Sequence, residues 1–129
     1  MKLQAKKDYD YTKIKQNAKI AIDRKAEAAR AKIATPGSIQ SSVYREKLEE
    51  ARNYLNGVED DFVLLSAELE ISKASDMEEL ANIIVTNFNN WKTRMAKIEK
   101  IRPSRKAMID NCENDIHKIE SLVTNTVFT

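Results

Sequence analysis

The sequence predicts an all-α fold, an antiparallel helical bundle with a helical hairpin and a long C-terminal helix. The 129 residues include only two glycines and two prolines, and the abundant alanine, lysine and glutamate lose little side-chain freedom in helices. One proline and one glycine are adjacent, at Pro36 and Gly37. From Ser75 onward, apolar residues recur at alternating steps of three and four over about fifty residues, which indicates a long helix with helical partners.

The first helix is predicted over residues 12–34. Ile14, Ala18 and Ile22 recur at helical spacing, so they lie on one alanine-rich stripe. Pro36 cannot continue a helix, and the glycine after it tolerates the backbone of a helix-ending turn. The stretch TPGSIQSS is therefore predicted to connect two antiparallel helices.

The second helix is predicted over residues 42–56, where Ser41 or Ser42 can cap its N-terminus. Asn56-Gly57 ends it. Apolar residues at steps of three and four again define its buried stripe. The predicted core anchors on this helix are Tyr44, Leu48 and Leu55.

A short helix is predicted around residues 62–71, followed by the long helix. Ser75 and Glu78 have the spacing of a capping box at the start of the long helix. Within its seven-residue repeat, Phe88 and Trp91 occupy adjacent core positions, and we expect them to be core anchors.

The repeat is interrupted where Arg102 and Arg105 take both core positions of one heptad, with Pro103 between them. Proline inside a helix predicts a kink or a short break there. Fifty residues of helix extend about 75 Å, which is longer than the two preceding helices can cover. We therefore expect an interface beyond Pro103; the alternative is that the chain folds back at Pro103 and covers itself. The interface candidates in this region are Arg102, Arg105, Ile109, Ile116, Ile119 and Val123.

The predicted organisation is an N-terminal arm over residues 1–11 and a single helical domain over residues 12–129. Tyr9 and Tyr11 of the arm are further interface candidates. The charged N-terminus has no apolar segment typical of a secretory signal, and the longest apolar run, Phe62-Val63-Leu64-Leu65, is too short to span a membrane. We expect the protein to be made in the cytoplasm.

The charges are unevenly distributed along the chain. Residues 1–33 carry ten Lys or Arg and four acidic residues, and residues 41–80 carry four and eleven. Residues 81–129 carry eight and five. Such blocks attract one another within or between chains, or are simply solvated. The basic residues of 92–106 spread around the predicted helix, so nucleic-acid binding is not favoured.

No catalytic or cofactor site is predicted, and no metal site either. His117 is the only histidine and Cys112 the only cysteine, so a cluster of metal ligands or a histidine-based catalytic pair is not favoured. We expect His117 to be exposed and Cys112 to pack as a small apolar residue. The acidic loop Glu59-Asp60-Asp61 has no calcium-binding pattern around it.

One long stretch resembles a pattern found in small bacteriophage tail-fibre-associated and tail-fibre assembly proteins. Residues 26–55 contain AAR-KI-TPG followed by Y--K--EAR-YL, with dashes for variable positions. The likeness continues in LA-IIV---N-W, from Leu80 to Trp91, and in I---R---K--I, from Ile98 to Ile109. Pro103 and the basic N-terminal arm depart from the pattern.

The resemblance implies a non-enzymatic structural protein of a phage tail, a helical adaptor or fibre-associated component located in the virion. Its partners would be other tail or fibre proteins, in a homo- or hetero-oligomer. The alternative is an assembly chaperone that holds an unfinished fibre and is absent from the mature particle. The resemblance carries over no catalytic residues.

Overall fold

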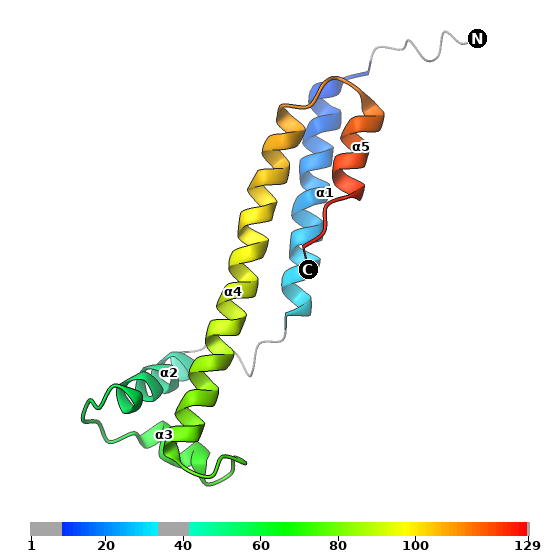
Figure 1. The fold of residues 1–129 in the computed structure, drawn as a ribbon. Helices are drawn as coiled ribbons and strands as arrows, with labels where there is room; N and C mark the ends of the chain where they lie inside the picture. Colours follow the sequence, from blue (N-terminus) through cyan, green and yellow to red (C-terminus); the bar gives the residue numbers. More distant parts are fainter. Residues whose placement is uncertain (1–8, 34–41, 129) are drawn as a thin grey trace. The chain divides into compact units, whose positions relative to one another are not determined.

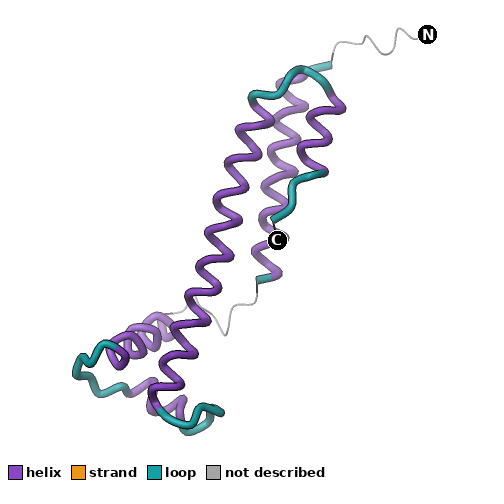
Figure 2. Tube along the Cα trace, viewed as in Figure 1, coloured by secondary structure: helices purple, strands orange, loops and turns teal. Residues whose placement is uncertain are grey.

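The computed structural model describes residues 9–33 and 42–128, and every regular element in these ranges is a helix (Figures 1 and 2). Helices account for 77% of the described residues, more than twice the share in an ordinary domain. The predicted all-α helical bundle is therefore confirmed. The helices are α1 (Tyr11–Lys32), α2 (Ser42–Leu55), α3 (Val63–Leu69), α4 (Met77–Asp110) and α5 (Ile116–Thr124).

The chain divides into two compact units, and α4 contributes to both. The basic unit, as we call it for its charge, contains residues 1–32 and 95–129. The acidic unit contains residues 33–94. The predicted single domain over 12–129 concerns independent folding and stays a prediction.

In the basic unit, α1 lies between the C-terminal part of α4 and α5 (Figure 1). Ion pairs join α1 to α4 in antiparallel order, from Lys19–Asp110 at one end to Arg30–Glu99 at the other. The core uses small residues on α1 and isoleucines on its neighbours, as the alanine-rich stripe predicts. The buried residues of this unit are Ala18, Ile22, Ala26, Ala29, Ile98, Ile109, Ile119, Thr126 and Phe128.

The long C-terminal helix is shorter than the sequence predicts. Pro103 lies inside α4, which continues through it without a break and ends at Asp110. The chain then turns in the segment Asn111-Cys112-Glu113-Asn114-Asp115, whose residues mostly favour helix caps and turns over helix interiors. Asp115 starts α5 by accepting hydrogen bonds from the backbone N–H groups of His117 and Lys118, at 3.0 and 3.2 Å. The chain thus folds back on itself, but after Asp110 and not at Pro103.

The acidic unit has its own core, built from α2, α3 and the start of α4. The predicted anchors Tyr44 and Leu48 are buried in it, and Phe88 and Trp91 are half-buried against it. Leu55 is 37% exposed, so it is not a core anchor. It is the last residue of α2, beyond the buried stripe that ends at Ala51. The buried cluster is Tyr44, Leu48, Ala51, Leu65, Leu80, Ala81 and Ile84.

Helix α2 ends as Asn56-Gly57 predicts. Gly57 has a φ of +72°, and its N–H donates to the carbonyl of Tyr54 at 3.2 Å. The N–H of Val58 donates to the carbonyl of Asn53 at 2.9 Å. These two bonds make a Schellman motif, in which the left-handed position favours glycine.

The N-cap of α4 is one residue later than the sequence predicts. Asp76, not Ser75, accepts the hydrogen bond from the backbone N–H of Glu79, at 2.8 Å. Ser75 instead donates its hydroxyl to the Glu79 carboxylate at 2.7 Å. Asp76 therefore caps α4 in place of the predicted Ser75–Glu78 pair, and its charge is favourable at the positive end of the helix.

Helix α3 receives its N-terminal cap from another helix. Its own preceding residue, Phe62, is in the left-handed region with a φ of 50° and provides no side-chain cap. The Glu50 carboxylate of α2 accepts instead from the N–H groups of Leu64 and Leu65, each at 3.0 Å. A seven-residue helix is too short to persist alone, so this contact and the burial of Leu65 fix it to α2.

Replacing Glu50 by alanine should destabilise the protein by about 1–2 kcal/mol, because two N–H groups at the helix start lose their acceptor. Denaturation in urea, followed by circular dichroism, would measure the loss. Glu49→Ala is the matched control, since Glu49 is exposed on the same helix. Equal stability of the two variants would contradict the capping role of Glu50.

The connector TPGSIQSS, except for its last residue Ser42, lies outside the described residues, as does most of the N-terminal arm. Of the two arm tyrosines, Tyr11 is the first residue of α1, and Tyr9 is 42% exposed. Their rings meet edge to face with centroids 5.8 Å apart.

Candidate functional site

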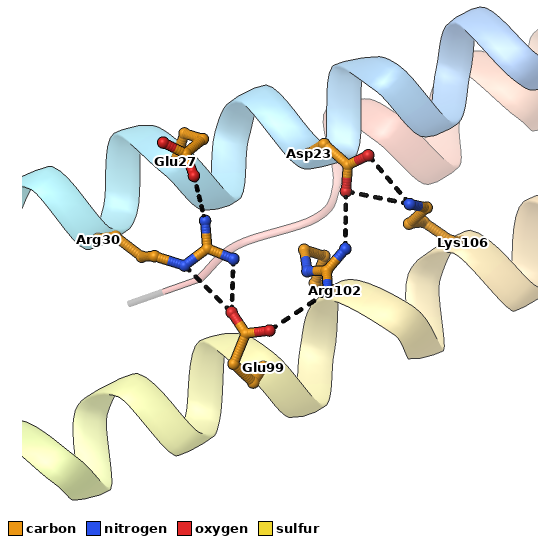
Figure 3. A network of polar contacts seen from close by, with 6 residues as sticks. All are labelled: Asp23, Glu27, Arg30, Glu99, Arg102 and Lys106. Carbon is orange, nitrogen blue, oxygen red and sulfur yellow. Dashed lines mark hydrogen bonds and ion pairs between the residues drawn. The ribbon is translucent and has the colours of Figure 1, made fainter.

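The structure gathers most of the interface candidates in the basic unit, around α1, the end of α4 and α5. Arg102, one of the two arginines in the core positions of the repeat, takes part in an ion-pair network (Figure 3). Arg102 Nη1 and Lys106 Nζ both contact the Asp23 carboxylate of α1, at 3.1 and 3.0 Å. Arg102 Nη2 also contacts Glu99 at 3.3 Å, and Glu99 pairs with Arg30 at 2.5 Å. Arg102 therefore joins two helices within the chain.

The network shifts the titration of its acids. Hydrogen bonds from Lys106 and then Arg102 hold the pKa of Asp23 below its ordinary value, although partial desolvation acts in the opposite direction. The hydrogen bond from Arg30 lowers the pKa of Glu99 in the same way. Both carboxylates are therefore ionised at neutral pH and contribute attraction between α1 and α4.

This network predicts a stability difference that depends on pH. A carboxyl group with a lowered folded pKa stabilises the fold above its unfolded pKa, which is about 3.9 for Asp, and the effect disappears as the pH falls through the folded pKa. Asp23→Asn should therefore cost about 0.5–1 kcal/mol at pH 7, since the side chain is 40% exposed. The difference between the variant and the parent should shrink as the pH falls below about 3.9, and it should vanish only below the folded pKa of Asp23.

Urea denaturation of both proteins from pH 7 to 3 would measure this difference. Glu27→Gln serves as the control, because Glu27 is 75% exposed and makes a single ion pair, with Arg30. A constant difference between Asp23→Asn and the parent at all pH values would show that the carboxylate charge is not responsible.

Three lysines of α1 bind the C-terminal ends of the other helices in the basic unit. Lys15 Nζ donates to the carbonyl of Cys112 at 2.6 Å, and Lys19 pairs with the Asp110 side chain at 2.8 Å. Lys25 Nζ donates to the carbonyls of Val123 and Thr126 at 2.7 and 3.0 Å. Cations stabilise the carbonyl ends of helices, so part of the basic first block is used inside the chain.

The predicted apolar interface beyond Pro103 is partly wrong. Ile109 is fully buried and Ile119 is 1% exposed. Ile119 lies on α5, which folds back beside α1. Both isoleucines belong to the core of the basic unit and not to an unpartnered seam. The half-buried Ile116 and Val123 line a shallow groove between α1 and α5, together with Ile14.

A second groove lies on the other side of α5, against α4, and it contains Arg105. Arg105 belongs to α4, and His117 and Lys118 line the groove from α5. Lys118 pairs with Glu113 at 2.8 Å, and this contact raises the pKa of Lys118. Among the described residues, the half-buried Arg105 donates one side-chain hydrogen bond, to the Met108 sulfur at 3.6 Å, and no carboxylate pairs with it. Cys112, Ser121, Leu122 and Asn125 complete the lining.

The acidic loop after α2, residues 57–61, is an anionic surface. Asp60 is fixed there by hydrogen bonds from the Phe62 N–H and the Asn53 amide, at 3.2 and 3.3 Å. The Phe62 hydrogen bond is the main reason that the pKa of Asp60 is lowered. Glu59 and Asp61 are exposed and make no ion pair with other described residues.

The described residues contain no group of three or more His, Cys, Asp or Glu side chains able to hold a metal ion. None of the described helices combines the length and apolar character needed to cross a membrane. The chain matches no family model, no curated protein and no solved structure.

Sequence reasoning missed two functional elements, namely the Glu50 cap and the boundary between α4 and α5. The Asn-Cys-Glu-Asn-Asp segment could have revealed the boundary, because it is rich in residues that favour caps and turns. No local signal identifies Glu50, whose partners are 14 and 15 residues away.

Proposed function

We propose that the chain is a non-enzymatic structural protein of a bacteriophage tail, a helical adaptor or fibre-associated component of the virion. The proposal starts from the resemblance of residues 26–55 and 80–109 to small tail-fibre-associated proteins. The observation that supports it further is the role of these pattern residues: most of those in the described part pack or pair inside the helical units.

The pattern in α2 illustrates this. Lys47 pairs with Glu68 at 2.5 Å, Glu50 caps α3, and the Arg52 guanidinium lies 5.2 Å from the centre of the Phe88 ring. Tyr54 meets Phe62 edge to face at 5.4 Å. The buried Tyr44 and Ala51 are the apolar members of the same pattern.

The C-terminal part of the pattern behaves in the same way. Ile98 and Ile109 are buried, and Arg102 and Lys106 share Asp23. Residues that pack and pair with one another within the chain determine its shape. An adaptor contributes its shape to an assembly. An enzyme family would instead retain a set of reactive side chains at a common site.

Mass spectrometry of purified particles, from the phage whose genome encodes the chain, tests the proposal. A virion component should be present at a fixed ratio to the other tail proteins after stringent purification. Presence in infected-cell lysate together with absence from particles would favour the alternative, a tail-fibre assembly chaperone. Absence of any association with tail or fibre proteins in the lysate would contradict both.

A further inference from the structure

The two compact units carry opposite charges. Residues 9–32 and 95–128 contain 13 Lys or Arg against 8 acidic residues, a net charge of +5. Residues 42–94 contain 6 against 11, a net charge of −5. A chain with this division can attract further copies of itself, because each copy offers both a cationic and an anionic surface.

On the cationic unit, the candidate for a specific binding site is the groove between α4 and α5. Arg105 is half-buried there and has no carboxylate partner among the described residues, whereas the neighbouring Arg102 has both Asp23 and Glu99. A partly desolvated guanidinium gains from a carboxylate, which it can bind through two parallel hydrogen bonds. Lys118 adds a second cation, and Leu122 adds apolar surface in the same groove.

The acidic loop, residues 57–61, has features that complement this groove. Its ends are fixed by the Schellman motif at Gly57 and by the hydrogen bonds of Asp60. Glu59 and Asp61 are exposed on either side of Asp60, and the apolar Val58 beside them is 48% exposed. The loop thus presents two carboxylates and one apolar side chain from a held backbone, so little conformational freedom is lost on binding.

We propose that the groove lined by Arg105, His117 and Lys118 binds the Glu59–Asp61 loop of a second copy of this chain. The groove and the loop are different surfaces, so the contact is heterologous and repeats from head to tail. It generates a ring where the rotation closes and an open chain where it does not. The inference rests on charge and side-chain placement, and it holds whether or not the protein belongs to a phage tail.

Sedimentation velocity of the purified full chain, over a range of concentrations, tests this contact. The parent should associate at low salt and dissociate in about 0.5 M NaCl, because surface charges are screened. Arg105→Glu and Asp61→Arg should each weaken association at least about tenfold, which corresponds to 1.4 kcal/mol. The double variant Arg105→Glu/Asp61→Arg should regain association, since the two charges are exchanged.

Matched controls separate this contact from a general charge effect. Lys100→Glu changes the charge equally on the exposed side of α4, and Glu70→Arg does so after α3; both should associate like the parent. Arg105→Gln removes the charge with less disturbance of the groove, and a thermal melt of each variant checks its fold. A parent that stays monomeric at every concentration, or a Lys100→Glu variant as impaired as Arg105→Glu, would overturn the proposal.

Failure of this test leaves the particle experiment unaffected, because a tail component can be held by other proteins. Conversely, self-association of the purified chain with no trace of it in particles would retain this contact and reject the tail function.

Discussion

Replacing Ile109 by alanine is expected to destabilise the basic unit by about 2–5 kcal/mol, the usual cost of truncating a fully buried isoleucine. Ile109 has no exposed surface, and it lies on α4 close to Asp110, to which Lys19 of α1 is bound. The cavity left by the lost atoms would form between packed helices, where it cannot readily collapse. Urea denaturation of the purified chain would give the size of the loss.

The neighbouring residue provides the control. Met108 is 45% exposed, so Met108→Ala should change the free energy of unfolding by less than about 1 kcal/mol. Equal effects of the two substitutions would mean that Ile109 is not buried in solution. If Ile109→Ala instead keeps its stability and loses self-association, Ile109 belongs to an exposed interface, as the sequence predicts.

The sequence predicted which face of α4 is covered. Each core position of the seven-residue repeat, from Met77 to Ile109, is buried or half-buried in the structure. The periodicity could be read because it depends only on the spacing of apolar side chains along one helix. The periodicity could not identify which helix packs against that face, because the apolar stripe of any helix would fit it.

Long-range polar contacts account for most of what the sequence could not predict. Arg102 in a core position looked like an interruption of the seam, but its partner Asp23 is 79 residues away. Glu50 looked like one of many surface acids on α2, yet it caps another helix. Such pairs follow from the packed arrangement of helices, and no local rule assigns a charged residue to a distant partner.

The position of the candidate interface shifted for the same reason. The sequence predicted an apolar seam beyond Pro103, whereas Ile109 and Ile119 are buried and a groove lies on each side of α5. Arg105 stays an interface candidate, as predicted from its core position in the repeat. The absence of a counter-ion for it among the described residues is visible only in the structure.

Replacing Leu65 by alanine should have a comparable effect in the acidic unit, about 2.7–5 kcal/mol. Leu65 is fully buried and is the one buried residue of α3. Its N–H also donates to Glu50, so the side chain and the backbone of one residue both attach α3 to its surroundings. A helix of seven residues cannot compensate for the lost packing through its own hydrogen bonds.

Hydrogen exchange would detect this effect locally. In Leu65→Ala, the amides of α3 should lose most of their protection, because the helix detaches from the rest of the acidic unit. Leu64→Ala is the matched control, since Leu64 is half-buried on the same helix and its N–H also donates to Glu50; it should retain most of the protection. If α3 stays protected in Leu65→Ala, the Glu50 cap is sufficient to hold the helix, and the apolar contact is not what fixes it in place.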